Sequence, residues 1–275
     1  MTTQTKNSNR IQQTFEHLET QGKAALIPYI MAGDPSLDVT QSLILTLEKA
    51  GADLIELGVP FSDPIADGPV IQKAAERALK AGTTLSAILK MVHTIRKQSS
   101  IPLILMTYYN SIMAMGEKTF CAQAVEAGID GVIVPDMPPE ESDTLCRASS
   151  LAGGPIPIFL LAPTSTQSRQ VEVITRTKGF IYYVSIAGIT GAKLRDMTSV
   201  KKNVKKIQKA AKKPVAVGFG ISTPEDVKAA LKAGAAGAIS GSAVVKIIEA
   251  NLDDLDAMTT QLKTFVSDMK AATAL

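Results

Sequence analysis

Short apolar runs alternate along the chain with longer segments in which apolar residues recur every three or four positions. The runs are continuous rather than alternating apolar and polar, which is typical of parallel strands covered on both faces. Helical patterns lie between the runs, and this order favours an α/β fold. We predict eight strands, over residues 25–31, 53–57, 101–106, 131–134, 156–161, 180–184, 215–217 and 238–239.

A weak internal repeat supports this organisation. Residues 50–58, 127–135 and 233–241 each begin with Ala-Gly and continue into a strand. Glycine directly after a helix is the usual left-handed stop, so each segment joins a helix end to a strand. Eight such units favour a closed (β/α)8 barrel, and 275 residues suit one barrel domain over 1–275. We expect an extra helix over 11–20 at the bottom of the barrel and disorder in 1–10.

Composition narrows the classes of partner. Hydrophobic residues make up 45% and charged residues 20% of the chain, which is the balance of a globular protein with a large core. A net charge of +3 gives no electrostatic case for nucleic acid or an anionic membrane, although a small anionic substrate stays open. The lysine-rich segment 201–213 is predicted to be a helix with a solvated face, because Val204, Ile207 and Ala211 form an apolar stripe.

The chain shows no apolar run of the roughly 18 residues that a membrane span needs, and its start has no signal-like apolar segment, so we expect a cytosolic protein. Cys121 and Cys146 lack metal-site or disulfide spacing and are interpreted as packing residues. His17 and His93 lie away from strand ends, which argues against histidine catalysis and a metal site.

Two acidic residues stand out where the second predicted strand ends. Glu56 interrupts an apolar strand, and burial there would raise its pKa and suit a general acid or base. Alternatively, Glu56 satisfies backbone donors or pairs with a buried base. Asp67 follows eleven positions later in a proline-rich loop, where an acid is often only a turn or cap residue, but both could converge on one pocket.

Glycines mark three further loops at the same end of the barrel. The segments 218–222 and 240–242 follow the last two strands, where backbone N–H groups and a helix beginning at Ser242 could bind a phosphate; ligand-free tight turns are the alternative. The segment 185–193 contains Gly188, Thr190 and Gly191 and is predicted to be a mobile lid, or else an inert turn. Three tyrosines near strand ends could line a ring-binding pocket or simply be core residues: Tyr29, Tyr108 and Tyr182.

The run from Glu56 to Pro69, Glu-Leu-Gly-Val-Pro-Phe-Ser-Asp-Pro-Ile-Ala-Asp-Gly-Pro, closely resembles the signature of tryptophan synthase alpha subunits. The resemblance continues through 32–35, 107–110, 135–138, 182–185, 188–191, 218–222 and 237–242, so it covers nearly the whole chain after the first ~10 residues. It implies a (β/α)8 barrel that cleaves indole-3-glycerol phosphate into indole and glyceraldehyde 3-phosphate.

The resemblance also implies residue roles. Glu56 would be the general acid/base and Asp67 the second catalytic carboxylate, while the three tyrosines would line the indole pocket. Thr190 would order the lid. Some members of the family carry arginine where this chain has Ile186, so a lid contact made by that arginine would be missing here. Backbone groups of four residues would hold the phosphate: Gly191, Gly220, Gly241 and Ser242.

The family's partner is a beta subunit that carries pyridoxal phosphate, in an assembly of two alpha and two beta subunits. The resemblance therefore implies no cofactor on this chain, and we expect the partner to meet the loops at 60–63 and 136–139. Two alternatives stay open. A stand-alone indole-3-glycerol phosphate lyase would share the reaction and residues, and a non-catalytic activating barrel would not need both acids.

Overall fold

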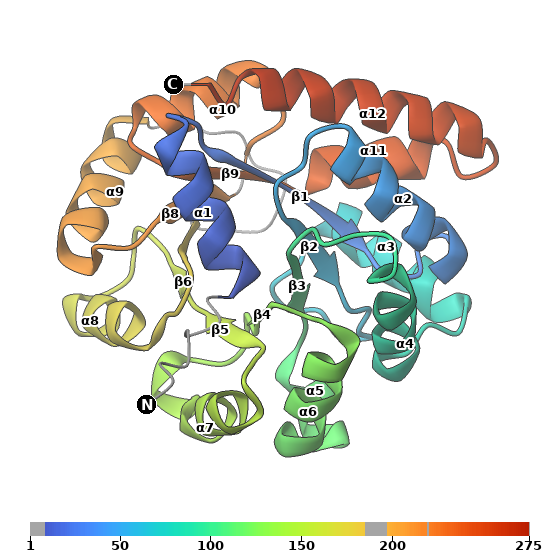
Figure 1. The fold of residues 1–275 in the computed structure, drawn as a ribbon, viewed down its shortest axis with the longest axis horizontal. Helices are drawn as coiled ribbons and strands as arrows, with labels where there is room; N and C mark the ends of the chain where they lie inside the picture. Colours follow the sequence, from blue (N-terminus) through green and yellow to red (C-terminus); the bar gives the residue numbers. More distant parts are fainter. Residues whose placement is uncertain (1–8, 185–196, 219, 275) are drawn as a thin grey trace, which may run out of the picture.

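A single parallel sheet forms the centre of the chain in the computed structural model, which describes residues 9–184, 197–218 and 220–274 (Figure 1). Its strands are ordered β5-β4-β3-β2-β1-β9-β8-β7-β6. Their bounds are β1 (Ala25–Met31), β2 (Ile55–Gly58), β3 (Leu103–Met106), β4 (Gly131–Ile133), β5 (Ile156–Ile158), β6 (Leu160–Leu161), β7 (Ile181–Val184), β8 (Val215–Gly218) and β9 (Gly237–Ser240).

The fifth predicted strand closes the sheet into a barrel. It is interrupted at Phe159, so the single apolar run 156–161 forms both β5 and β6. β5 pairs with β4 while β6 pairs with β7, and the two halves of one run therefore occupy the two ends of the strand order. This explains nine strand segments in an eight-stranded barrel. The predicted (β/α)8 fold is confirmed.

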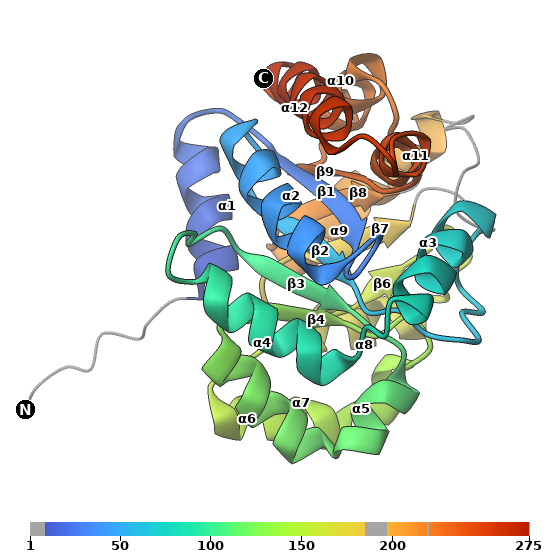
Figure 2. The same ribbon diagram turned by 90° about the vertical axis from the view of Figure 1, so that its right-hand side faces the viewer.

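Helices surround the sheet and cover its outer face (Figures 1 and 2). None of those in the described residues is long and apolar enough to cross a membrane. Their bounds are α1 (Arg10–Thr20), α2 (Leu37–Lys49), α3 (Pro69–Lys80), α4 (Leu85–Ile95), α5 (Tyr109–Met115), α6 (Glu117–Ala127), the 3-10 turn η1 (Pro139–Glu141), α7 (Asp143–Ala152), α8 (Gln167–Arg176), α9 (Met197–Ala211), α10 (Pro224–Lys232), α11 (Ser242–Ala250) and α12 (Leu255–Ala271).

Local sequence accounts for where these helices begin and end. Thr223 and Asp226 form a capping box at the start of α10, and Pro224 occupies its first turn. In α9, Val204 and Ile207 are buried beneath a lysine-rich exposed face. That pattern confirms the solvated helix face expected over 201–213.

The predicted extra helix, α1, lies at one end of the barrel (Figure 2). Its apolar face buries Ile11, Phe15 and Leu18 in a cluster with residues of the barrel interior, and the Phe15 ring centroid lies 5.3 Å from that of Phe180. Burial of three such side chains contributes about 1.5–3 kcal/mol each. Arg10 is also ordered, through a 2.7 Å ion pair with Asp130, and Asn9 caps the helix. The disorder expected for residues 1–10 is therefore wrong for these two positions.

Candidate active site

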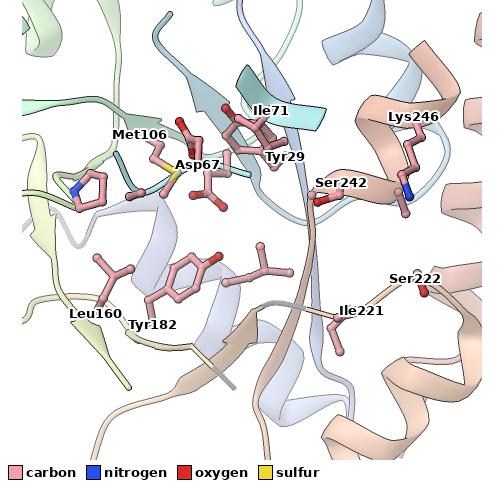
Figure 3. A pocket seen from close by; sticks show the side chains of 17 residues that line it. Tyr29, Asp67, Ile71, Met106, Leu160, Tyr182, Ile221, Ser222, Ser242 and Lys246 are labelled. Atoms are coloured by element: carbon pink, nitrogen blue, oxygen red, sulfur yellow. The ribbon is translucent and has the colours of Figure 1, made fainter. Parts of the chain in front are cut away.

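A cavity of about 270 Å³ opens at the carboxyl ends of the strands (Figure 3). Most of its lining comes from strand ends and from the loops that follow them, which is where (β/α)8 barrels place functional groups. Its described lining residues are Tyr29, Glu56, Ala66, Asp67, Ile71, Met106, Pro135, Leu160, Tyr182, Gly220, Ile221, Ser222, Ile239, Gly241, Ser242, Ala243 and Lys246.

Glu56 reaches this cavity from β2, beside Tyr29 of β1 in the strand register. Its side chain is 1% exposed, and Oε1 has no hydrogen-bond partner among the described residues. Burial, and then the charge of Asp67, raise its pKa to about 8. The described residues provide no buried base as an ion-pair partner, so the geometry favours a carboxyl group available to a ligand.

Asp67 enters the same cavity from the loop between β2 and α3. The Tyr108 hydroxyl donates a 3.2 Å hydrogen bond to its Oδ2, and the Gln72 amide donates to its backbone carbonyl at 2.8 Å. Burial raises the pKa of Asp67 to about 6, against the lowering effect of the Tyr108 hydrogen bond. The pKa of Glu56 therefore lies above that of Asp67. Two carboxyl groups whose pKa values differ in this way can supply an acid and an anion to one ligand.

Tyr29 and Tyr182 both line the cavity, and each ring needs a glycine on the neighbouring strand. A Cβ at Gly58 would lie 2.1 Å from the Tyr29 hydroxyl oxygen, and a Cβ at Gly218 would lie 2.5 Å from that of Tyr182. Neither space accepts a methyl group unless the ring moves. The two glycines therefore fix where the aromatic walls stand.

Tyr108 has a different place from the other two tyrosines. It is absent from the described lining, and its ring stacks on Phe61 with centroids 5.1 Å apart and an interplanar angle of 25°. Its hydroxyl accepts from the Ala66 backbone N–H at 3.0 Å and donates to Asp67. The structure thus brings Tyr108 to the acid rather than to the wall of the cavity.

The predicted phosphate-binding residues gather at one side of the cavity. Gly220, Gly241 and Ser242 all line it, and Gly220 has a φ of 78°, a conformation that favours glycine. α11 begins at Ser242, beside the cavity, and its N-cap residue Gly241 provides no side-chain hydrogen bond to the first backbone N–H groups. The other predicted residues here, Thr190 and Gly191, lie outside the described residues, as does Ile186.

Sequence reasoning missed several apolar lining residues. Met106 is the last residue of β3, Ile239 precedes the last residue of β9, Leu160 lies in β6, and Ile71 lies in the first turn of α3. Their positions at strand ends were available from the predicted boundaries, but nothing in their chemistry distinguishes them from core residues. Figure 3 shows Met106 and Leu160 on one side of the cavity and Lys246 near Ser242 on the other.

Two carboxyl groups lie in a partly apolar cavity at the mouth of a (β/α)8 barrel. These features define the protein as a (β/α)8-barrel enzyme. The model of one family, described as tryptophan synthase alpha chain, matches residues 15–274. The chain belongs to this family. It is a carbon–carbon lyase that cleaves indole-3-glycerol phosphate into indole and glyceraldehyde 3-phosphate in tryptophan biosynthesis.

Individual relatives agree with this assignment. A tryptophan synthase alpha chain of Geotalea uraniireducens is 50% identical over 264 residues, which are 96% of this chain and 97% of the relative. The crystal structure of tryptophan synthase subunit alpha from Legionella pneumophila superposes with a TM-score of 0.89 at 40% identity, covering 96% of this chain and 98% of that one.

A third relative comes from a complex. A chain from a structure of the tryptophan synthase a2b2 complex of Pyrococcus furiosus has a TM-score of 0.82 and 40% identity, with 90% of this chain and 98% of that chain covered. These relatives are all tryptophan synthase chains, so they give the stand-alone lyase no support.

Proposed function

We propose that Glu56 and Asp67 carry the cleavage of indole-3-glycerol phosphate. The observation that supports this is their shared cavity, in which the pKa of Glu56 is about 8 and that of Asp67 about 6. Protonated Glu56 gives its proton to C3 of the indole ring, and ionised Asp67 accepts the ring N–H and stabilises the positive charge that develops there.

The carboxylate left on Glu56 then takes the proton of the substrate hydroxyl. The carbon–carbon bond breaks, its electron pair restores the aromatic indole, and the hydroxyl carbon becomes the aldehyde of glyceraldehyde 3-phosphate. The proton given to C3 stays on the indole, and the proton taken from the hydroxyl regenerates Glu56. The cycle needs proton transfer and electrostatics only, which suits our proposal that this chain carries no cofactor of its own.

The remaining cavity residues bind the two ends of the substrate. Tyr29 and Tyr182 enclose the indole ring, and the N–H groups around Gly220, Gly241 and Ser242 bind the phosphate. On the family resemblance, Gly191 adds a phosphate contact and Thr190 orders a lid. The apolar side of the cavity and its glycine-rich side lie apart, as a substrate with a ring at one end and a phosphate at the other requires.

The Pyrococcus furiosus relative comes from an a2b2 complex, and we propose the same kind of assembly here, with pyridoxal phosphate on the beta subunit. An exposed groove beside the mouth supports a partner surface. Its lining includes Phe61, Asp63 and Ile65, and Ile65 is 80% exposed. We also propose that residues 1–275 form a single barrel domain and that the protein is cytosolic.

The test is Glu56→Gln, which keeps the side-chain volume and removes the titrating proton. We expect indole formation to fall by about 10²–10⁴-fold, while binding of a glycerol phosphate analogue stays near that of the wild type. Indole fluorescence measures the reaction against a low background, because the chain has no tryptophan. Activity above about a tenth of wild type would contradict the acid–base role.

A further inference from the structure

We propose that Tyr108 is a positioning residue that holds the Asp67 carboxylate toward the indole ring, rather than a wall of the ring pocket. The inference rests on the proposed role of Asp67. It assigns to Tyr108 a task in the reaction that needs its hydroxyl group and not merely its ring.

The geometry gives one hydroxyl two partners on the same loop. The Tyr108 oxygen accepts from the Ala66 N–H at 3.0 Å and donates to Asp67 Oδ2 at 3.2 Å. The loop backbone and its adjacent carboxylate are thus tied to one atom. Because Asp67 lies between β2 and α3, where no sheet hydrogen bonds fix the backbone, these two bonds restrict both the approach and the rotation of the carboxylate.

The Tyr108 side chain is itself held firmly. Tyr108 is the N-cap residue of α5, directly after the end of β3 and Thr107, and its ring stacks on Phe61. The stacking involves a residue of the same β2–α3 connection as Asp67, so it holds the ring against that loop. Substitution of tyrosine by phenylalanine at this position removes the hydroxyl and leaves the stack.

The ionisable groups around Asp67 determine how the Tyr108 hydroxyl affects the pKa of Asp67. The ionisable groups that face Asp67 are Glu56 from β2, Tyr29 from β1, Tyr182 from β7 and Tyr108 after β3. Burial raises the pKa of Asp67, and the Tyr108 hydrogen bond lowers it. Burial and the nearby Asp67 also raise the pKa of the Tyr108 phenol, so it stays a donor over the working pH range.

The experiment measures kcat/KM for indole formation from pH 5 to 9 in the wild type, Tyr108→Phe, Asp67→Asn and Tyr109→Phe. If activity needs ionised Asp67, kcat/KM decreases at low pH as Asp67 is protonated, and this decrease forms the acid limb of the pH profile. Loss of the Tyr108 hydrogen bond should move the acid limb to higher pH by about half to one unit. The activity deficit of Tyr108→Phe should therefore grow by roughly three- to tenfold between pH 8 and pH 5.

Tyr109→Phe is the matched control. Tyr109 is the next residue and its hydroxyl also donates to a carboxylate, that of Glu117 at 3.1 Å, but it is absent from the described cavity lining. Its profile should superimpose on that of the wild type. A ring-fluorinated tyrosine at position 108 gives a second test with the side chain retained: a more acidic phenol is a stronger donor and should move the acid limb downward.

A uniform loss of activity in Tyr108→Phe, with the acid limb unmoved, would overturn the positioning role and leave Tyr108 as a packing residue. The same holds if the fluorinated tyrosine leaves the limb in place. Failure of the proposed function looks different: in that case Asp67→Asn would retain the acid limb, or Glu56→Gln would remain active, whatever the Tyr108 variants do.

Discussion

Glu56→Gln should stabilise the folded chain increasingly as the pH rises from 5 to 8. In the folded protein the pKa of Glu56 is about 8, against an ordinary value of 4.5. The unfolded chain therefore releases this proton at a lower pH than the folded chain does. The stability contributed by the protonated, buried group is fully present below pH 4.5 and is lost as the pH rises through 8.

The size of the effect follows from the two pKa values. Between them, the free energy of unfolding of the wild type should decrease relative to the glutamine variant by about 1.4 kcal/mol per pH unit, for one proton. The difference would approach about 3 kcal/mol at pH 7 and about 5 kcal/mol above pH 8. Water entering the cavity would reduce these totals. The glutamine amide itself changes the free energy of unfolding by an amount that does not depend on pH.

Urea denaturation of both proteins at pH 5, 6, 7 and 8, followed by circular dichroism, gives the difference at each pH. The slope of that difference is the decisive quantity, because Asp67 and the other titrating groups are common to both chains. If the difference in unfolding free energy stays constant over this range, Glu56 is ionised in the folded protein at neutral pH. The proposed proton donor would then be refuted along with the stability argument.

Two further predictions concern the cavity wall and the partner surface. Gly58→Ala should cost about 1–3 kcal/mol of stability by overpacking and raise KM, because the new Cβ would lie 2.1 Å from the Tyr29 hydroxyl oxygen. Gly237→Ala, whose new Cβ has its nearest contact at 3.3 Å, should lose less stability when both variants are unfolded in urea. Asp63→Lys should weaken the binding of a beta subunit by roughly three- to tenfold in a titration and change the salt dependence of that binding. Indole formation by the free chain should be preserved. Unchanged binding would place the partner surface elsewhere.

The sequence predicted the strands well because most of their residues are apolar and buried. β1 runs from Ala25 to Met31, the range expected from its apolar run, and all seven of its residues are buried. The break at Phe159 was not predictable, since the run 156–161 is apolar throughout and the break depends on which neighbouring strand each half pairs with. Barrel closure, not local preference, decides that pairing.

Glu56 was conspicuous in the sequence because an isolated carboxylate in an apolar strand is costly, whereas Asp67 lies in a loop and was singled out by the family resemblance. The hydrogen bond from Tyr108 to Asp67 could not be predicted from the sequence. A tyrosine after a strand has the same local pattern whether its hydroxyl reaches a cavity or, as here, the Asp67 carboxylate 41 positions away in the chain. The partners of a hydroxyl depend on tertiary distances of a few ångströms, which hydrophobic periodicity does not encode.

The packing of α1 against the barrel interior bears on where the products leave. Ile11, Phe15 and Leu18 fill the lower end together with Phe180 and Ile158, in one buried cluster with Tyr182 and Ile239 of the cavity lining. We therefore expect both products to leave through the opening at the carboxyl ends of the strands. In the proposed binding mode, the phosphate lies beside the start of α11 and the ring lies against Tyr29 and Tyr182. A partner bound at this opening would then control the release of both products.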